Sequence, residues 1–308
     1  MTSNRDRHAP DPPGPAPGRD RAPHAEWLGW AIDAYAPDEM ARRVETVGVA
    51  KASQDKVTTF ALAVVAGAFV ALGAAFSTVA MADTGAAYSV TRLLGGLAFS
   101  LALVLVVIAG AELFTSNNLI VMAWASRKVP LGGLLANWGI VYVGNVVGVL
   151  ATAALLLATR HASFGEHAIA AQHIVTAATK VSRSFPEAVA VGVLGNALVC
   201  LAVWLGFSAR STVDKIVAVV PPVTALVAFE FDHIVANTYY LTAGLFLVYA
   251  DPGAVAASGQ GALAETVTIT AALANILPVT LGNLMGGGVL VALVYWFVYL
   301  RPGRSGSG

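Results

Sequence analysis

A short polar segment, residues 231–237, interrupts an apolar stretch long enough to cross a lipid bilayer. It reads Phe-Asp-His-Ile-Val-Ala-Asn, and most residues on either side, 213–229 and 238–249, are apolar. An ionisable group at membrane depth is costly and usually faces a cavity or a solute pathway. Two half-length apolar segments joined by polar residues are typical of a broken membrane helix with a substrate site at the break. We therefore expect His233 to lie beside a pore.

The composition indicates an integral membrane protein surrounded by lipid. Of the 308 residues, 57% are hydrophobic and 12% are charged, whereas an average soluble domain has about 25% charged residues. The formal net charge is zero, so nothing indicates a nucleic-acid partner. The sequence has no nucleophile triad, metal-ligand spacing or cofactor motif, so we expect neither an enzyme nor a bound metal or cofactor.

The chain divides into four regions. Residues 1–25 are rich in Pro, Arg and Asp, which predicts a disordered N-terminal tail. Residues 26–56 mix apolar and charged side chains, which predicts amphipathic helices on the cytoplasmic membrane surface, either as a simple anchor or as a gate over the pore mouth. Residues 57–301 are expected to form the membrane-spanning domain, and 302–308 a short tail.

Six membrane spans are predicted within the membrane-spanning domain. The second begins near Tyr88 and is too long for one straight crossing, so we expect a break at residues 112–118 like that at 231–237 in the fifth. Lys and Arg are more frequent in the short loops on the N-terminal side, which places both termini in the cytoplasm. The expected spans are 58–81, 88–125, 136–159, 187–207, 213–249 and 276–300, with a short helical piece at 262–274.

Two sets of Asn and Gly residues repeat with identical spacing in the third and sixth spans. They are Asn137, Gly144, Asn145 and Gly148, then Asn275, Gly282, Asn283 and Gly286. Each set follows a broken span within a group of three spans. Because a unit with an odd number of spans, duplicated in tandem, has two opposite topologies, the pattern predicts two inverted three-helix repeats.

Four motifs resemble those of the formate/nitrite transporter family: residues 111–116, 201–215, 231–237 and 278–288. The resemblance extends over roughly residues 30–301. It implies an all-α, aquaporin-like bundle of six helices, assembled as a homopentamer with one pore in each protomer. It implies passage of small monovalent anions or their acids, such as formate, nitrite, hydrosulfide or acetate, across a bacterial inner membrane.

The resemblance also implies roles for individual residues. His233 matches the central pore histidine, and Thr115 matches a threonine that can hydrogen-bond it. Lys180 matches a vestibule lysine, Asn196 matches a pore-lining asparagine, and Phe99 and Leu103 match apolar constriction residues. The broken-helix loops are expected to contain Glu112, Phe114, Asn117, Phe231, Asp232 and Asn237.

Elementary electrostatics gives these assignments a physical reason. Moving a bare anion into a low-dielectric medium has an idealised cost of about 20 kcal/mol. Lys180 and the half-helix dipoles can concentrate the anion at the pore mouth. The imidazole of His233, with an unperturbed pKa near 6.5, can donate a hydrogen bond or a proton. We therefore expect the anion to take up a proton near His233 and to cross as the neutral acid.

Three positions depart from the family pattern, and the first two bear on selectivity. Leu226 occupies the position of a second aromatic constriction residue, and Glu230 occupies a position where the family usually has a small residue; Asp232 replaces a glutamate. A pore-facing Glu230 would repel anions and favour cations or weak bases such as ammonium or ammonia. The alternative is that Glu230 points away and pairs with a backbone donor or a basic side chain.

Most of these residues also have a purely structural interpretation. His233 could be a satisfied structural histidine, Lys180 an ordinary surface lysine, and Phe99 a core side chain. Three further histidines, His161, His167 and His173, are not spaced to share one helix face. We expect them to be loop residues rather than metal ligands.

Overall fold

The computed structural model describes residues 34–301, which form one compact unit. All regular structure in this range is helical, so the all-α prediction is confirmed. The predicted tails 1–25 and 302–308, and the first part of the amphipathic region, 26–33, lie outside the described residues.

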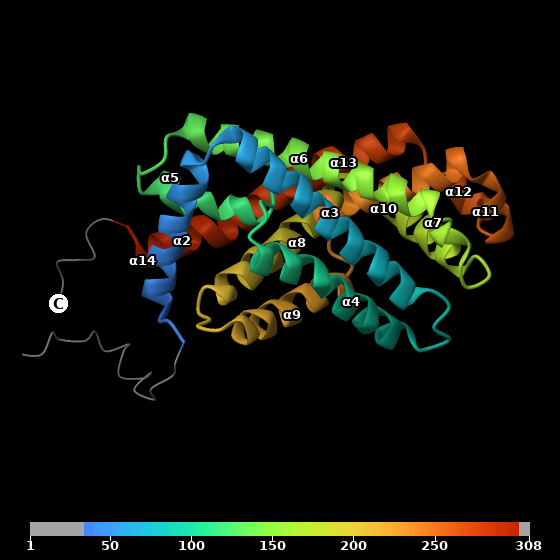
Figure 1. Cartoon of the computed structure of the whole chain (residues 1–308), viewed down its shortest axis with the longest axis horizontal. Coiled ribbons are helices and arrows are strands. Elements are labelled where there is room, and N and C mark those ends of the chain that lie inside the picture. The colour runs from blue at the N-terminus through green and yellow to red at the C-terminus, as the bar shows by residue number, and fades with distance from the viewer. Residues whose placement is uncertain (1–33, 302–308) are drawn as a thin grey trace, which may run out of the picture. The chain divides into compact units, whose positions relative to one another are not determined.

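The helices follow one another along the chain with short connections (Figure 1). They are α2 (Pro37–Ser53), α3 (Lys56–Met81), α4 (Tyr88–Ala109), the 3₁₀ helix η1 (Ser116–Ile120), α5 (Val121–Ala125), α6 (Leu131–Ala158), η2 (His161–Ser163), α7 (Ala168–Val181), α8 (Phe185–Gly206), α9 (Thr212–Ala228), α10 (Ile234–Ala250), α11 (Pro252–Ala257), α12 (Gly261–Ala264), α13 (Ile269–Asn283), the π-helical η3 (Leu284–Leu293) and α14 (Val294–Tyr299).

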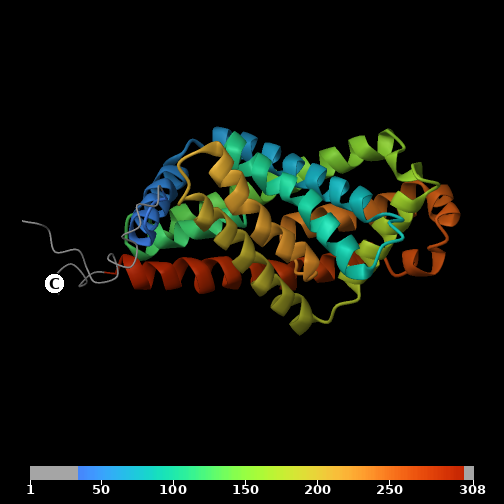
Figure 2. The same ribbon diagram turned by 90° about the horizontal axis from the view of Figure 1, so that it is seen from below.

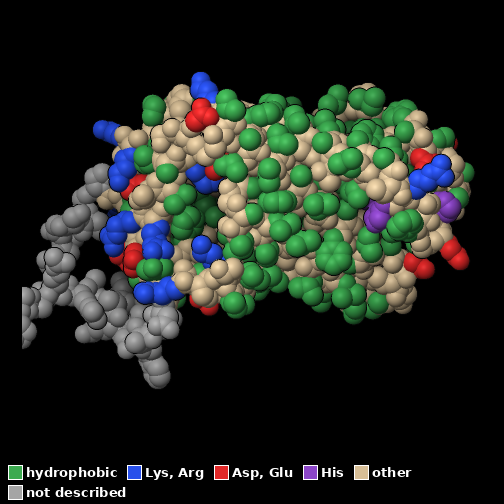
Figure 3. Space-filling view, in the orientation of Figure 1, with side chains coloured by type: hydrophobic (Ala, Val, Ile, Leu, Met, Phe, Trp, Pro, Cys, Tyr) green, Lys and Arg blue, Asp and Glu red, His purple; other side chains and the backbone are tan. Residues whose placement is uncertain are grey.

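Five stretches of helix in the described part are long and apolar enough to span a membrane. They are α3, α4, α6, α8 and the continuous stretch Ile269–Tyr299, while α10 is a shorter apolar helix. Large apolar side chains such as Leu97, Leu155 and Leu273 are exposed. Hydrophobic side chains cover the middle of the face in Figure 3, and charged ones gather toward its two ends. This is the surface of a multi-pass membrane protein.

Both predicted helix interruptions are present. The helix α4 ends at Ala109, and the next helical turn, η1, begins at Ser116; α9 ends at Ala228, and α10 begins at Ile234. The helices resume earlier than predicted, so Asn117 and Asn237 lie in the first turns of η1 and α10 rather than in the loops. For α10 the reason is a local cap, because the His233 side chain accepts a hydrogen bond from Ala236 N.

The predicted short helical piece at 262–274 is present with different bounds: the short helix α12 ends at Ala264, and residues 269–274 belong to the next helix. One long helix runs from Ile269 to Tyr299 along the bundle (Figure 2). It begins at Ile269 because Thr268 Oγ1 accepts a hydrogen bond from Ala271 N, 3.2 Å away. Pro278 is tolerated inside this helix, as in other membrane helices whose freed backbone groups find local partners.

The helix α7 corrects the prediction that His173 is a loop residue. His173 lies on this helix and is buried, with its ring centroid 5.8 Å from that of Tyr239. Short α-helices between long apolar spans have a weak sequence signal, and this one was missed. The helices α7, α11 and α12 lie at one end of the bundle, and α2 and α5 lie at the other (Figure 1).

Close contact between long helices depends on glycine. A Cβ added at Gly148 on α6 would lie 2.0 Å from the carbonyl oxygen of Val64 on α3. A Cβ added at Gly286 would lie 2.0 Å from the carbonyl oxygen of Val193 on α8. These backbones therefore pack at distances that any side chain would prevent, as is common in membrane helix pairs.

We predict that Gly148→Ala destabilises the protein by about 1–3 kcal/mol or more, because α3 and α6 must move apart. The measurement is thermal unfolding of the detergent-purified protein. Gly139→Ala on the same helix is the control, since its Cβ meets nothing within 4 Å. Equal melting temperatures for the two variants would contradict this view of the packing.

Candidate functional site

The two helix breaks meet at one buried hydrogen bond. Thr115 Oγ1 lies 2.6 Å from His233 Nε2, and both residues are almost completely buried. His233 Nδ1 accepts a hydrogen bond from Ala236 N at 3.2 Å. Because a neutral imidazole has one acceptor and one donor nitrogen, this contact assigns the proton to Nε2, which donates to Thr115. Protonation of Nδ1 would break the cap of α10.

Asn196, on α8, contacts the first break through its side-chain amide. Its Nδ2 donates to Asn118 Oδ1 at 3.0 Å and to the carbonyl oxygen of Asn283 at 2.7 Å, and it lies 3.4 Å from the carbonyl oxygen of Thr115. Cys200 Sγ contacts the same Thr115 oxygen at 3.3 Å. Asn196 is fully buried, so its amide is used within the protein core, and its predicted role in lining the pore stays a prediction.

One asparagine, Asn145, satisfies the backbone of the first break. Its Oδ1 accepts a hydrogen bond from Phe114 N at 2.9 Å. Its Nδ2 donates to the carbonyl oxygens of Glu112 at 2.9 Å and Ala63 at 2.8 Å. Phe114 and Glu112 thus lie in the loop as predicted, with their main-chain groups paired.

A second asparagine, Asn283, makes the same set of bonds to the second break. Its Oδ1 accepts from Ile234 N at 2.8 Å. Its Nδ2 donates to the carbonyl oxygens of Asp232 at 2.9 Å and Gly192 at 2.8 Å. The two breaks are therefore held by the same pattern of hydrogen bonds, from residues that occupy matching places in the Asn/Gly repeat.

Each break also carries an ion pair between a lysine and a buried carboxylate, beside two asparagines. At the first, Lys51 Nζ lies 3.0 Å from Glu112 Oε1 and 2.9 Å from Asn117 Oδ1. Asn117 Nδ2 donates to Asn137 Oδ1 at 2.9 Å, and Asn137 Nδ2 donates to the carbonyl oxygen of Lys51 at 3.3 Å. The surface helix α2, which carries Lys51, is thereby tied to the break.

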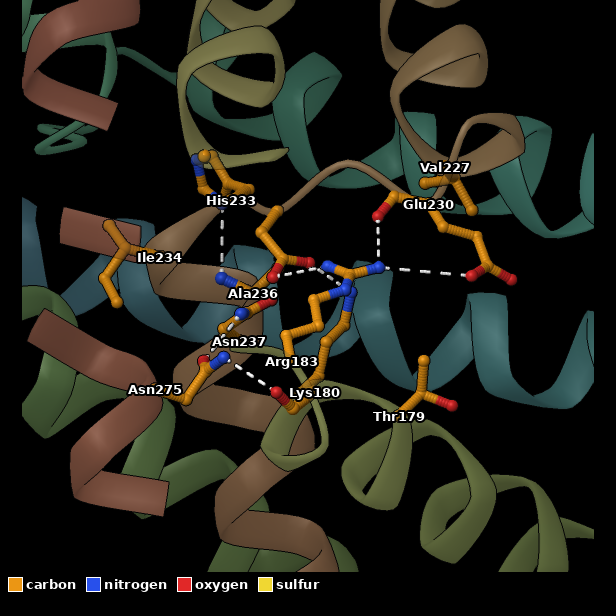
Figure 4. A network of polar contacts seen from close by, with 12 residues as sticks. Thr179, Lys180, Arg183, Val227, Glu230, His233, Ile234, Ala236, Asn237 and Asn275 are labelled. Atoms are coloured by element: carbon orange, nitrogen blue, oxygen red, sulfur yellow. Dashed lines mark hydrogen bonds and ion pairs between the residues drawn. The ribbon is translucent and has the colours of Figure 1, made fainter. Parts of the chain in front are cut away.

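The second break has the corresponding contacts (Figure 4). Lys180 Nζ pairs with Asp232 Oδ1, and Asn237 Nδ2 donates to Asn275 Oδ1 at 3.0 Å. Asn275 Nδ2 donates to the carbonyl oxygen of Lys180 at 2.8 Å. Lys180 is therefore buried and paired, which corrects its interpretation as an ordinary surface lysine.

A cavity leads from this polar cluster toward α4 and α7. Its lining includes His233, Asn237, Lys180, Arg92, Glu230, Phe231, Phe99 and Leu226. Leu103 lies one turn beyond Phe99 on α4 and is buried without lining this cavity. The cavity thus combines charged groups, two apolar side chains from the predicted constriction and the imidazole at the break.

Glu230 both faces the cavity and pairs with other side chains, although the sequence suggested that it would do one or the other. It lines the cavity, and its carboxylate also lies among donors: Oε1 is 3.0 Å from Tyr88 OH and 3.6 Å from Arg92 Nη1, and Oε2 is 4.0 Å from Arg183 Nη2. The prediction missed Arg92 and Arg183 as site residues. The available signal was an arginine near the start of an apolar span.

Broken membrane helices that meet at a buried polar centre beside a cavity are typical of channels and transporters. The chain belongs to the formate/nitrite transporter family, since residues 38–297 match the family model of that description. The predicted family is therefore confirmed.

The relatives include bacterial channels of similar length. The chain is 39% identical over 274 residues to the formate channel FocA of Escherichia coli K12, covering 88% of this chain and 96% of FocA. It is 34% identical over 268 residues to FocB of the same strain, covering 83% and 92%. A solved pentameric formate channel with formate bound has a TM-score of 0.74 at 39% identity, covering 80% of this chain and 98% of that chain. An FNT family ion channel has a TM-score of 0.73 at 26% identity, covering 84% and 98%.

We predict that Asn283→Ala destabilises the protein by about 2–4 kcal/mol, because it leaves buried backbone groups of the second break unpaired at roughly 1–3 kcal/mol each. Thermal unfolding in detergent measures the loss. Gln172→Ala is the control, because within residues 34–301 the only hydrogen bond from that amide goes to Thr176 on its own helix. A melting temperature for Asn283→Ala equal to the control would show that the break does not depend on Asn283.

Proposed function

We propose that this protein is a channel or transporter for small monovalent anions and their acids, with formate and nitrite as the leading substrates, and that movement is linked to a proton at His233. The observation that carries the proposal is the neutral His233 held between two helix breaks, with its Nε2 donating to Thr115. The same imidazole lines a cavity that also contains Lys180 and Arg92.

The physical sequence of events follows from these groups. The cationic side chains of the cavity attract the anion. Near His233 the Nε2–H becomes a donor to the anion in place of Thr115, where the surroundings are buried and charge is costly. A proton from the external water converts the anion to the neutral acid and removes that cost, while His233 stays neutral and donates only a hydrogen bond. The acid then passes the apolar side chains of Phe99, Leu103 and Leu226.

A cation or weak base is the less favoured substrate. The alternative depended on Glu230 presenting an uncompensated carboxylate to the pore. That carboxylate instead lies between two guanidinium groups, those of Arg92 and Arg183. The local charge therefore favours an anion.

We further propose a homopentamer of six-span protomers, each built from two inverted three-helix repeats. The pentamer is suggested by the related formate channel, and the repeats are supported by the matching bonds of Asn145 and Asn283. We place the protein in a bacterial inner membrane with both termini in the cytoplasm and α2 at the cytoplasmic mouth, where it contacts η1 and α5.

We predict that formate uptake into liposomes holding the purified protein rises as the external pH falls at constant internal pH, because the acid form carries the flux. His233→Ala should reduce this uptake at least about tenfold, because it removes a hydrogen bond to a charged group, which contributes roughly 1.5–3 kcal/mol. His161→Asn is the control, since it changes a histidine of η2 outside the cavity. Formate flux that ignores pH and survives His233→Ala would refute the proposal.

A further inference from the structure

Glu230 has a backbone conformation that favours glycine. Its φ angle is +57°, a left-handed value that few non-glycine residues adopt. It lies directly after α9, at the entry to the second helix break. Strained residues of this kind persist where the surrounding contacts hold them, and they often mark functional sites. A glutamate at this position therefore has a conformational cost that a glycine would not have.

Three donors from different parts of the chain converge on this side chain. Tyr88 and Arg92 come from the start of α4, and Arg183 comes from the loop between α7 and α8 (Figure 4 shows the Arg183 contacts). A hydroxyl and two planar guanidinium groups are the donors expected around a small carboxylate or a nitrite ion.

The two guanidinium groups are held in place by other contacts. Arg92 Nη2 donates to the carbonyl oxygen of Val227. Arg183 Nη1 pairs with Asp232 Oδ2 at 2.6 Å, and its Nη2 donates to the carbonyl oxygen of Glu230 at 2.8 Å. The guanidinium groups would therefore stay in position if the Glu230 carboxylate moved away. Arg92 Nε is, in addition, buried without a hydrogen-bond partner among residues 34–301.

The carboxylate makes one direct hydrogen bond, which it accepts from Tyr88 OH at 3.0 Å, and its contacts with the two arginines are longer. Its separations from Arg92 and Arg183 are 3.6 and 4.0 Å, beyond direct hydrogen-bond length. The Glu230 side chain is 35% exposed, whereas those of Arg92 and Arg183 are 16% and 13% exposed, so solvent reaches the carboxylate more readily than the guanidinium groups. A solute anion can therefore compete for the same donors.

We propose that Tyr88, Arg92 and Arg183 form an outer binding site for a small monovalent anion, and that the carboxylate of Glu230 occupies this site as a tethered competitor. This inference rests on the proposed function and adds a specificity-determining residue to it. With Glu230 in place, three cations, Arg92, Lys180 and Arg183, face two carboxylates, Glu230 and Asp232. Displacing the Glu230 carboxylate leaves one more positive charge for the substrate.

The competitor lowers the apparent affinity for the anion, because the site is free for only a fraction of the time. Removing the charge of Glu230 should therefore tighten binding. Glu230→Gln keeps the size of the side chain, and Glu230→Gly restores an unstrained backbone. We expect either variant to lower the apparent Kd for formate by about 3–10-fold, the size of effect expected for one partly screened charge.

The experiment measures formate-dependent thermal stabilisation of the full-length, detergent-purified protein, together with the KM for formate uptake in liposomes. Glu265→Gln is the matched control, an exposed glutamate in the segment between α12 and α13 that has no ion pair among the described residues. Adding Arg92→Gln to Glu230→Gln should raise the apparent Kd again, because it removes one of the donors.

An unchanged or higher apparent Kd in folded Glu230→Gln and Glu230→Gly would overturn the proposal, as would formate that stabilises none of the variants. If Glu230→Gln fails to fold, the apparent Kd of Glu230→Gly for formate is the deciding measurement. Absence of formate flux in the wild-type protein would instead refute the proposed function, and the ratio of apparent Kd values would still test the outer site.

Discussion

Two helices that break inside a membrane leave backbone N–H and C=O groups without helical partners, and lipid offers them none. Asn145 and Asn283 supply those partners, each bonding one N–H and one C=O of a break and one carbonyl of a neighbouring helix. The rest of the site depends on this arrangement. Once the breaks are held, Thr115 and His233 can meet at 2.6 Å in the middle of the bundle.

Both buried carboxylates at the helix breaks form ion pairs with lysines. Glu112 and Asp232 are buried, and each is matched by a lysine from another element. Burying a carboxylate without such a partner would be prohibitive. Beside the cavity, the cationic side chains Arg92, Lys180 and Arg183 face the carboxylates of Glu230 and Asp232.

Much of this architecture was predictable from patterns with a direct physical cause. Apolar length indicated the long helices, and polar residues within apolar stretches indicated the breaks, because both patterns follow from the low dielectric of lipid. Family motifs pointed to His233 and Thr115. Helix ends were less predictable. The helix α10 begins at Ile234 because the His233 ring caps its N-terminus. The last long helix begins at Ile269 because the Thr268 hydroxyl caps it in the same way. Such caps depend on rotamers that a residue pattern does not specify.

The residue pattern was enough to predict that this chain crosses a membrane, that its second and fifth apolar stretches are interrupted, and that a histidine lies at one interruption. The contacts of those groups followed only from how the helices pack. Lys180 is paired rather than free, His173 lies on a buried helix, and Glu230 both faces the cavity and meets two arginines. The reason is that hydropathy is a property of single residues and their spacing. Hydrogen bonds and ion pairs, in contrast, join residues far apart in the chain and depend on how the helices pack.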